Sequence, residues 1–177
     1  RAVFHDKNDF TYSVIAPIRI FNYSIDNAYR QICSCIIKAL SSLGIKSALE
    51  NKNDIIVNGK KISGNASKAM DKGVYLQHGT LIYDIDFGVM PKILNISEDD
   101  IKEKVTSVLH HKKIRHEKVY GTLRDSFISD KEFKTEDISK YELMRAEDLA
   151  STKYNTITPT AGTFVKNKGA CYVERGN

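Results

Sequence analysis

Lys61 and the residues next to it are the part of this chain best suited to bind a charged ligand. The dipeptide Asn58-Gly59 readily accepts the two positive φ angles of a type I′ turn, so residues 54–57 and 60–63 are predicted to form a hairpin. Lys61 lies on the second strand, where its ammonium would be a point of positive charge. The small residues at 64–66 follow, and they would let backbone amides approach a ligand closely.

Pairing across this turn predicts which side chains share a face of the hairpin. The expected opposite pairs are Val57 with Lys60, Ile56 with Lys61, and Ile55 with Ile62. The apolar face would hold Ile55, Val57 and Ile62, and the polar face Asp54, Ile56, Lys61 and Ser63. Such a polar face suits a polar ligand, and it is also typical of the solvated side of an antiparallel sheet.

Residues 73–83 are predicted to form another strand, interrupted at His78-Gly79. A glycine inside a strand indicates a bulge or a close approach of another group to the backbone. His78 and Thr80 are expected on the same side of this strand. A single strand histidine fits a structural role as well as a chemical one.

Three motifs stand in a fixed order along the chain. The first is RAVFHD at residues 1–6, the second is NDIIVNGKKISGNA at 53–66, and the third is LQHGTL at 76–81. Together they resemble the lipoate-protein ligase family, within the superfamily of biotin and lipoate attachment enzymes. The resemblance covers residues 1 to about 110. The first motif lacks the glycines that usually precede it, so we expect that a part of the native protein lies upstream of Arg1.

The resemblance implies an ATP-dependent enzyme that activates lipoate as lipoyl-AMP and transfers the lipoyl group to a lysine of a carrier domain. The implied cofactors are ATP and Mg²⁺. The implied partners are apo lipoyl domains, either of 2-oxoacid dehydrogenase E2 subunits or of the glycine cleavage H protein, and some family members also need a separate accessory domain.

The same resemblance assigns roles to residues of the three motifs. Lys61 corresponds to the catalytic residue, which contacts the acyl carbonyl and the phosphate. Asn53 and Asp54 would bind the nucleotide together with Lys61, and Asp54 would also be a ligand of Mg²⁺. The residues assigned to the acyl substrate are His5, Ser63, Gly64, Ala66, His78, Gly79 and Thr80.

Two other functions stay open on the sequence. Octanoyl or lipoyl transferases of the same superfamily use a cysteine nucleophile, which needs an activated thiolate. No cysteine lies between Leu49 and Lys61 or near His78, and Cys171 is the only candidate. The other alternative is a non-catalytic subunit that binds lipoyl-adenylate or a carrier domain.

Composition limits the remaining classes. The chain has 177 residues, 41% of them hydrophobic, and a net charge of +5, which is enough for one compact domain and favours anionic partners. We find no nucleic-acid-binding module and no zinc spacing among His110, His111 and His116, although residues 110–118 form a dense basic patch. No apolar run approaches the length of a membrane span, so a cytoplasmic location is expected.

The predicted fold is α/β (α+β), with a mixed, largely antiparallel sheet and packing helices, incomplete at its N-terminus. We predict a catalytic domain over residues 1–155 and a tail over 156–177, with an edge strand near 170–174. The other predicted elements are a strand at 10–16, a helix from Ser24 to Gly44, a short strand or connector at 45–49, and helices at 89–94, 98–109 and 135–153.

Overall fold

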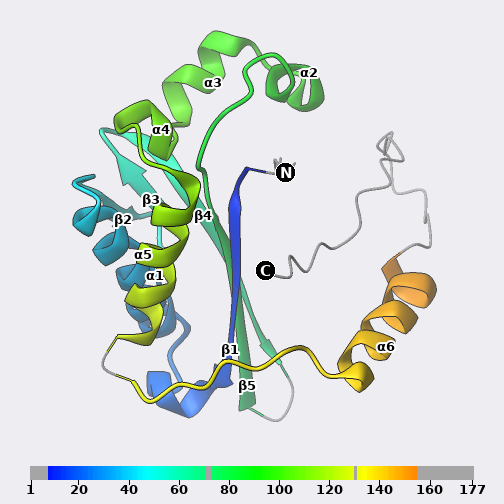
Figure 1. Ribbon diagram of the computed structural model, residues 1–177. Helices are drawn as coiled ribbons and strands as arrows, with labels where there is room; N and C mark the ends of the chain where they lie inside the picture. The colour runs from blue at the N-terminus through cyan, green and yellow to red at the C-terminus, as the bar shows by residue number, and fades with distance from the viewer. Residues whose placement is uncertain (1–7, 71–72, 130, 155–177) are drawn as a thin grey trace. The chain divides into compact units, whose positions relative to one another are not determined.

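The structure is a computed structural model that describes residues 8–70, 73–129 and 131–154. These residues fall into two units, the first ending at Phe133 and the second beginning at Lys134 (Figure 1). His5 and the rest of the first motif, Cys171 and the strand predicted at 170–174 lie outside the described residues. The domain boundary predicted at residue 155 stays a prediction.

The first unit is built on a five-stranded antiparallel sheet with the strand order β1-β5-β4-β3-β2. Its strands are β1 (Phe10–Pro17), β2 (Ala48–Glu50), β3 (Asp54–Val57), β4 (Lys60–Met70) and β5 (Val74–Leu81). This arrangement, with helices packed on it, confirms the predicted fold class.

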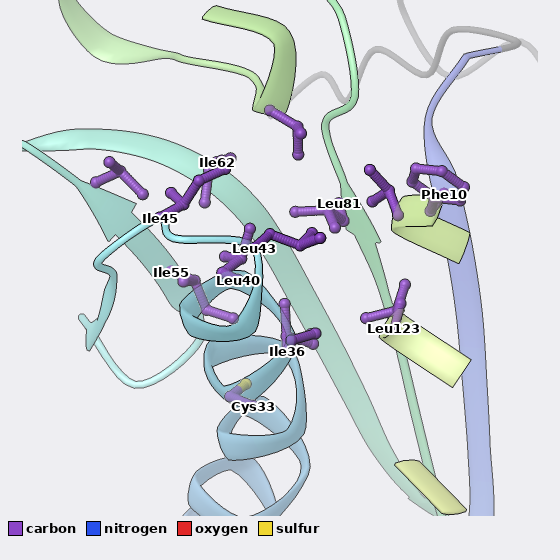
Figure 2. Close-up of a cluster of buried hydrophobic side chains, with 14 residues drawn as sticks. Phe10, Cys33, Ile36, Leu40, Leu43, Ile45, Ile55, Ile62, Leu81 and Leu123 are labelled. Carbon is purple, nitrogen blue, oxygen red and sulfur yellow. The ribbon is translucent and has the colours of Figure 1, made fainter. Parts of the chain in front are cut away.

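Two helices, α1 (Ile25–Ser42) and α5 (His116–Ile128), pack on one face of the sheet and enclose the main core. Figure 2 shows this cluster, with Ile36 and Leu40 of α1 beside Leu81 of β5 and Leu123 of α5. The start of α1 follows the prediction, because the Ser24 hydroxyl accepts a hydrogen bond from the Asn27 backbone N–H at 3.2 Å. α5 was not predicted as a helix.

The alternation of side chains along β5 separates this covered face from the opposite one. Tyr75, Gln77 and Leu81 are fully or almost fully buried under the helices, whereas His78 is exposed. Because strand residues alternate between faces, His78 and Thr80 lie on the same side of β5, as predicted. This side faces away from α1 and α5. We call this side of β3, β4 and β5 the Lys61 face; its members are Asp54, Lys61, Gly64, Ala66, His78 and Thr80.

The hairpin between β3 and β4 turns at Asn58-Gly59 as predicted, with φ values of 50° and 76°. Val57 pairs with Lys60 and Ile56 with Lys61, which confirms those two predicted pairs. The third predicted pair is wrong, because the register shifts and Ile55 pairs with Ser63 rather than with Ile62. Two residues of β4 therefore oppose one residue of β3, which is the arrangement of a β-bulge.

The interruption predicted at His78-Gly79 is also wrong. β5 pairs without a break on both sides, with Ser13 opposite His78 in β1 and Asn65 opposite Gly79 in β4. The irregularity that the sequence placed in β5 lies instead in the hairpin.

Three short helices follow the sheet in the first unit: α2 (Met90–Leu94), α3 (Glu98–Lys104) and α4 (Val108–His111). The helix predicted to run to residue 109 ends at Lys104, because Val105 leaves it to form a parallel bridge with Lys61. Ser97 caps α3 as predicted, accepting a hydrogen bond from the Asp100 backbone N–H at 3.0 Å.

The second unit contains α6 (Lys140–Leu149) followed by a π-helical turn at Ala150–Tyr154. The predicted start at Thr135 is wrong. Ser139 and Glu142 form a complete capping box, which fixes the helix start at residue 140. None of the helices in the two described units is long and apolar enough to cross a lipid bilayer.

Candidate active site

The Lys61 face carries one ion pair, between Lys61 Nζ and Asp54 Oδ1 at 2.6 Å. The lysine side chain is 30% exposed and the aspartate side chain 13% exposed. An ammonium held by a mostly buried carboxylate has few orientations open to it, and it still reaches the surface. The pair therefore restricts the position of the Lys61 ammonium on this face of the sheet.

The β-bulge places Gly64 beside this ammonium. Residues 61 and 64 of a regular strand point to opposite faces, and the extra residue of the bulge brings them to the same one. A Cβ atom on Gly64 would lie 2.7 Å from Lys61 Cε and 2.8 Å from Nζ. Since real side chains do not come so close, the lysine head occupies space that only glycine leaves open.

The backbone of Lys61 is held along both edges of β4. On one edge it pairs with Ile56 of β3, and on the other it forms the parallel bridge with Val105. The Thr106 N–H donates to the Lys61 carbonyl at 2.9 Å, and the Thr106 hydroxyl lies 2.9 Å from His111 Nε2. Burial, with the nearby charges of His110 and Lys60, lowers the pKa of His111. At neutral pH the His111 imidazole is therefore uncharged, and its contact with the Thr106 hydroxyl supports the segment that pairs with Lys61.

Cross-strand neighbours extend this face from the ion pair across the sheet. Gly64 lies opposite both Asp54 and Thr80, and the next row places Ala66 opposite His78. The structure thus brings together six of the predicted site residues, namely Asp54, Lys61, Gly64, Ala66, His78 and Thr80. Gly64 has no side chain and Ala66 only a methyl group, so this row of the face carries little side-chain bulk.

Three predicted site residues are not part of this face. Ser63 is fully buried with Ile55, because the bulge turns both Ile62 and Ser63 toward the helices. The prediction that Ser63 shares a face with Lys61 is therefore wrong. Gly79 also turns its Cα hydrogens to the covered side, and the Asn53 side chain donates to the Asn65 carbonyl at 2.7 Å.

The close approach predicted at Gly79 does occur, but protein groups make it. A Cβ atom there would collide with Asn65 Oδ1 and would lie 2.8 Å from the Tyr12 hydroxyl. No buried hydrogen-bonding role was predicted for the side chains of Tyr12 and Asn65. Their signal would have been a polar side chain at an inward-facing position of a strand, which requires a buried partner.

The residues do not form a metal site by themselves. In the part of the chain that the structure describes, no three His, Cys, Asp or Glu side chains lie close enough together to hold a metal ion. The Oδ1 atom of Asp54 faces the Lys61 ammonium. The assignment of Asp54 to Mg²⁺ stays a prediction.

The two described cysteines, Cys33 and Cys35, lie away from the Lys61 face. Cys33 is fully buried under the sheet, and burial raises the pKa of its thiol to about 11. Cys35 is partly exposed on the same helix, α1, which packs on the opposite side of the sheet from Lys61. Neither thiol belongs to the Lys61 face.

Solved structures identify the fold as that of lipoate and biotin ligase catalytic domains. A crystal structure of lipoate-protein ligase A bound with ATP matches with a TM-score of 0.73 and 24% identity, covering 87% of this chain and 65% of that one. A Thermoplasma acidophilum putative lipoate protein ligase with bound lipoic acid matches with a TM-score of 0.72 and 23% identity, over 87% and 65% of the two chains.

The sequence comparison then gives the family. The model of the lipoyl protein ligase A/B catalytic domain matches residues 1–128, so the chain belongs to this family.

Curated relatives include both ligases and transferases. A probable lipoate-protein ligase A of Mycoplasma genitalium is 37% identical over 58% of this chain and 30% of its own length. A putative lipoate-protein ligase A of Aeropyrum pernix is 30% identical over 87% and 62%. An octanoyltransferase LipM of Clostridioides difficile is 28% identical over 84% and 66%. The chain thus spans about a third to two thirds of the length of these relatives.

Proposed function

We propose that the protein is an ATP-dependent lipoate-protein ligase, which activates lipoate as lipoyl-AMP and transfers the lipoyl group to a lysine of a carrier domain. The observation that carries the proposal is the Lys61 ammonium, held 2.6 Å from Asp54 above the space left by Gly64. Membership of the lipoyl ligase family supports it.

The chemistry explains why a fixed cation matters. A carboxylate is a poor electrophile at neutral pH, so the lipoate oxygen first attacks the α-phosphate of ATP and pyrophosphate leaves. The amine of the carrier lysine then attacks the carbonyl of the mixed anhydride, and AMP leaves. Negative charge grows on the phosphate in the first step and on the carbonyl oxygen in the second, and a preoriented cation stabilises both transition states.

In this scheme the chain's own residues bind and orient the reactants. Lys61 meets the phosphate and then the acyl carbonyl, while Asp54 holds the ammonium in place. Gly64 and Ala66 let the mixed anhydride lie close to the strand backbone, with His78 and Thr80 at its border. Mg²⁺, when bound, would neutralise the nucleotide phosphates; that ion commonly takes only one or two carboxylates from a protein.

The proposed carrier is an apo lipoyl domain, of an E2 subunit or an H protein. The net charge of +5 favours an acidic partner. One structural relative is described as a bi-partite lipoate protein ligase studied with its E2 lipoyl domain. A separate accessory chain is therefore included in the assay below.

The alternative function is an octanoyl or lipoyl transferase, which the similarity to an octanoyltransferase LipM favours. That reaction needs a thiolate nucleophile. Because Cys33 and Cys35 lie away from Lys61, the alternative depends on Cys171, which is outside the described residues.

Carrier mass separates these functions. One arm supplies ATP, Mg²⁺, lipoate and an apo lipoyl domain, with and without an accessory chain; the other supplies an octanoyl-carrier protein and no ATP. The ligase proposal predicts a lipoyl mass increase in the first arm alone, and the same result for Cys171→Ser. Modification in the second arm alone, lost in Cys171→Ser, would establish the transferase. Modification in neither arm would leave the non-catalytic binding function.

A further inference from the structure

We propose that a chain of partly buried hydrogen bonds on the helix-covered face of the sheet positions Lys61, and that Asn65 and Tyr12 are its central positioning residues. The catalytic consequence rests on the function proposed above, whereas the positioning itself can be tested without any activity. The chain runs on the helix-covered face, on the side of the sheet opposite to the Lys61 ammonium.

Asn65 ties the start of β3 to β4 through three hydrogen bonds. Its backbone N–H and its Nδ2 both donate to the Asn53 carbonyl, at 3.0 and 2.9 Å. In return, Asn53 Nδ2 donates to the Asn65 carbonyl at 2.7 Å. Asn53 directly precedes Asp54, and Asn65 directly follows Gly64. The three bonds therefore fix the two strands at the point where the ion pair and the glycine meet.

Tyr12 links the hydrogen bonds between Asn53 and Asn65 to the rest of the sheet. Its hydroxyl donates to Asn65 Oδ1 and accepts from Gln77 Nε2 at 3.3 Å. Gln77 Oε1 in turn accepts from the Tyr75 hydroxyl at 2.8 Å. Burial raises the pKa of Tyr12, so its hydroxyl keeps the proton that it donates to Asn65. The side-chain amide of Asn65 is thereby held in the orientation that points Nδ2 at Asn53.

Gly79 is the residue that allows this contact. It lies opposite Tyr12 in β1 and opposite Asn65 in β4, so both side chains cross above its Cα atom. Any larger residue would occupy the place of the Tyr12 to Asn65 hydrogen bond. Asn65 is 5% exposed and Gln77 is fully buried. If either residue lost a hydrogen-bond partner, water could not readily take that partner's place.

Competitive acetylation measures the position of the Lys61 ammonium directly. The protein is treated with a trace of acetic anhydride, and fragmentation mass spectrometry gives the ratio of acetylation at Lys61 to acetylation at its neighbour Lys60. In the wild type the ion pair with Asp54 protects Lys61. Asn65→Ala and Tyr12→Phe are expected to release Asp54 and to raise the ratio about fivefold, the effect of losing a partly exposed ion pair.

Tyr75→Phe is the matched control, because it also removes one tyrosine hydroxyl from the same chain of hydrogen bonds, three hydrogen bonds away from Asn65. It is expected to lower the melting temperature as Tyr12→Phe does and to leave the acetylation ratio within twofold of wild type. Circular dichroism checks that each variant is folded, and Tyr12→Phe carries the test if Asn65→Ala does not fold.

Three results decide the proposal. A raised ratio in Tyr12→Phe but not in Tyr75→Phe supports it, and in an active ligase kcat should fall by at least about tenfold while KM for lipoate stays within about twofold. A raised ratio in a protein without ligase activity supports the positioning and refutes the proposed function. A wild-type ratio in folded Tyr12→Phe and Asn65→Ala would overturn the inference.

Discussion

Replacing Gly64 with alanine should separate activity from stability in this protein. The new Cβ atom would lie 2.7 and 2.8 Å from the two terminal atoms of the Lys61 side chain. Because those atoms belong to the free end of a flexible side chain, the lysine can yield without a shift of the backbone. Gly64 does not have a positive φ, so alanine fits its backbone conformation.

Gly64→Ala should change the reaction rate strongly and the stability only slightly. Ordinary carbon contacts lie at about 3.5–4.0 Å, so the lysine head must move by about 1 Å. A displacement of about 1 Å of a catalytic group can cost about 10²-fold in rate, which is about 2.7 kcal/mol of activation free energy. The ion pair loses at most about 1 kcal/mol, and replacing glycine returns about 0.4–1 kcal/mol through the unfolded state. The melting temperature should therefore stay within about 4 °C of wild type.

The assay follows lipoylation of an apo carrier domain by mass and unfolding by circular dichroism. Gly121→Ala serves as the control, since nothing lies within 4 Å of a Cβ atom at that helical position. It should keep full activity and unfold at the same or a higher temperature. Full activity of Gly64→Ala at wild-type stability would refute the reasoning that the position of the lysine head matters.

Three further predictions concern the surroundings of the site. Burial raises the pKa of the Cys33 thiol from its usual 9.0 to about 11, so the folded state holds the proton more tightly than the unfolded state. The free energy of unfolding should therefore fall as the pH rises from 9 to 11. Thermal melts of Cys33→Ala should show a smaller fall over the same pH range. Burial lowers the pKa of His111 from its usual 6.5, so the unfolded state binds the proton first as the pH drops. The free energy of unfolding should therefore fall below about pH 6.5, and the imidazole should titrate below that value by NMR. His111→Gln should make the free energy of unfolding less dependent on pH in this range. Gly59→Ala should cost about 1–2 kcal/mol in urea unfolding, because its φ of 76° is a left-handed conformation; an unchanged midpoint would contradict the turn assignment.

The hairpin could be predicted because its signal is local. Asn58-Gly59 selects the turn, and the apolar residues at 55, 57 and 62 select the buried face, all of which the structure confirms. The bulge could not be predicted in the same way. Nothing in the types of Ile62 and Ser63 favours an extra residue there, and the register beyond the turn is set by β5, which pairs Ser63 with Leu81.

The end of α3 shows a similar competition between local and tertiary structure. The sequence pattern continues as a helix to residue 109, but the backbone groups of Lys61 at the start of β4 need a partner beyond the end of β5. Val105 and Thr106 provide it, and the helix stops at Lys104. Such a requirement is visible only when the sheet is assembled.

The site itself was predictable in part. The turn of the hairpin predicted that Asp54 and Lys61 share a face, and alternation along residues 73–83 predicted the same for His78 and Thr80. Only the family resemblance joined the two pairs in one site, and the structure brings them together with Gly64 and Ala66. The misplacement of Ser63 follows from the missed bulge. The hydrogen bonds among Tyr12, Asn65 and Gln77 were missed because their partners come from three different strands.

The central claim is that the Lys61 ammonium stabilises the charge that develops when lipoate is adenylated. Lipoate-dependent exchange of radiolabelled pyrophosphate into ATP measures that half-reaction alone, without a carrier. We predict exchange in the wild type and a loss of at least about 10²-fold in a folded Lys61→Met variant, which keeps the side-chain stem and removes the charge. Exchange at the wild-type rate in that variant would contradict the claim.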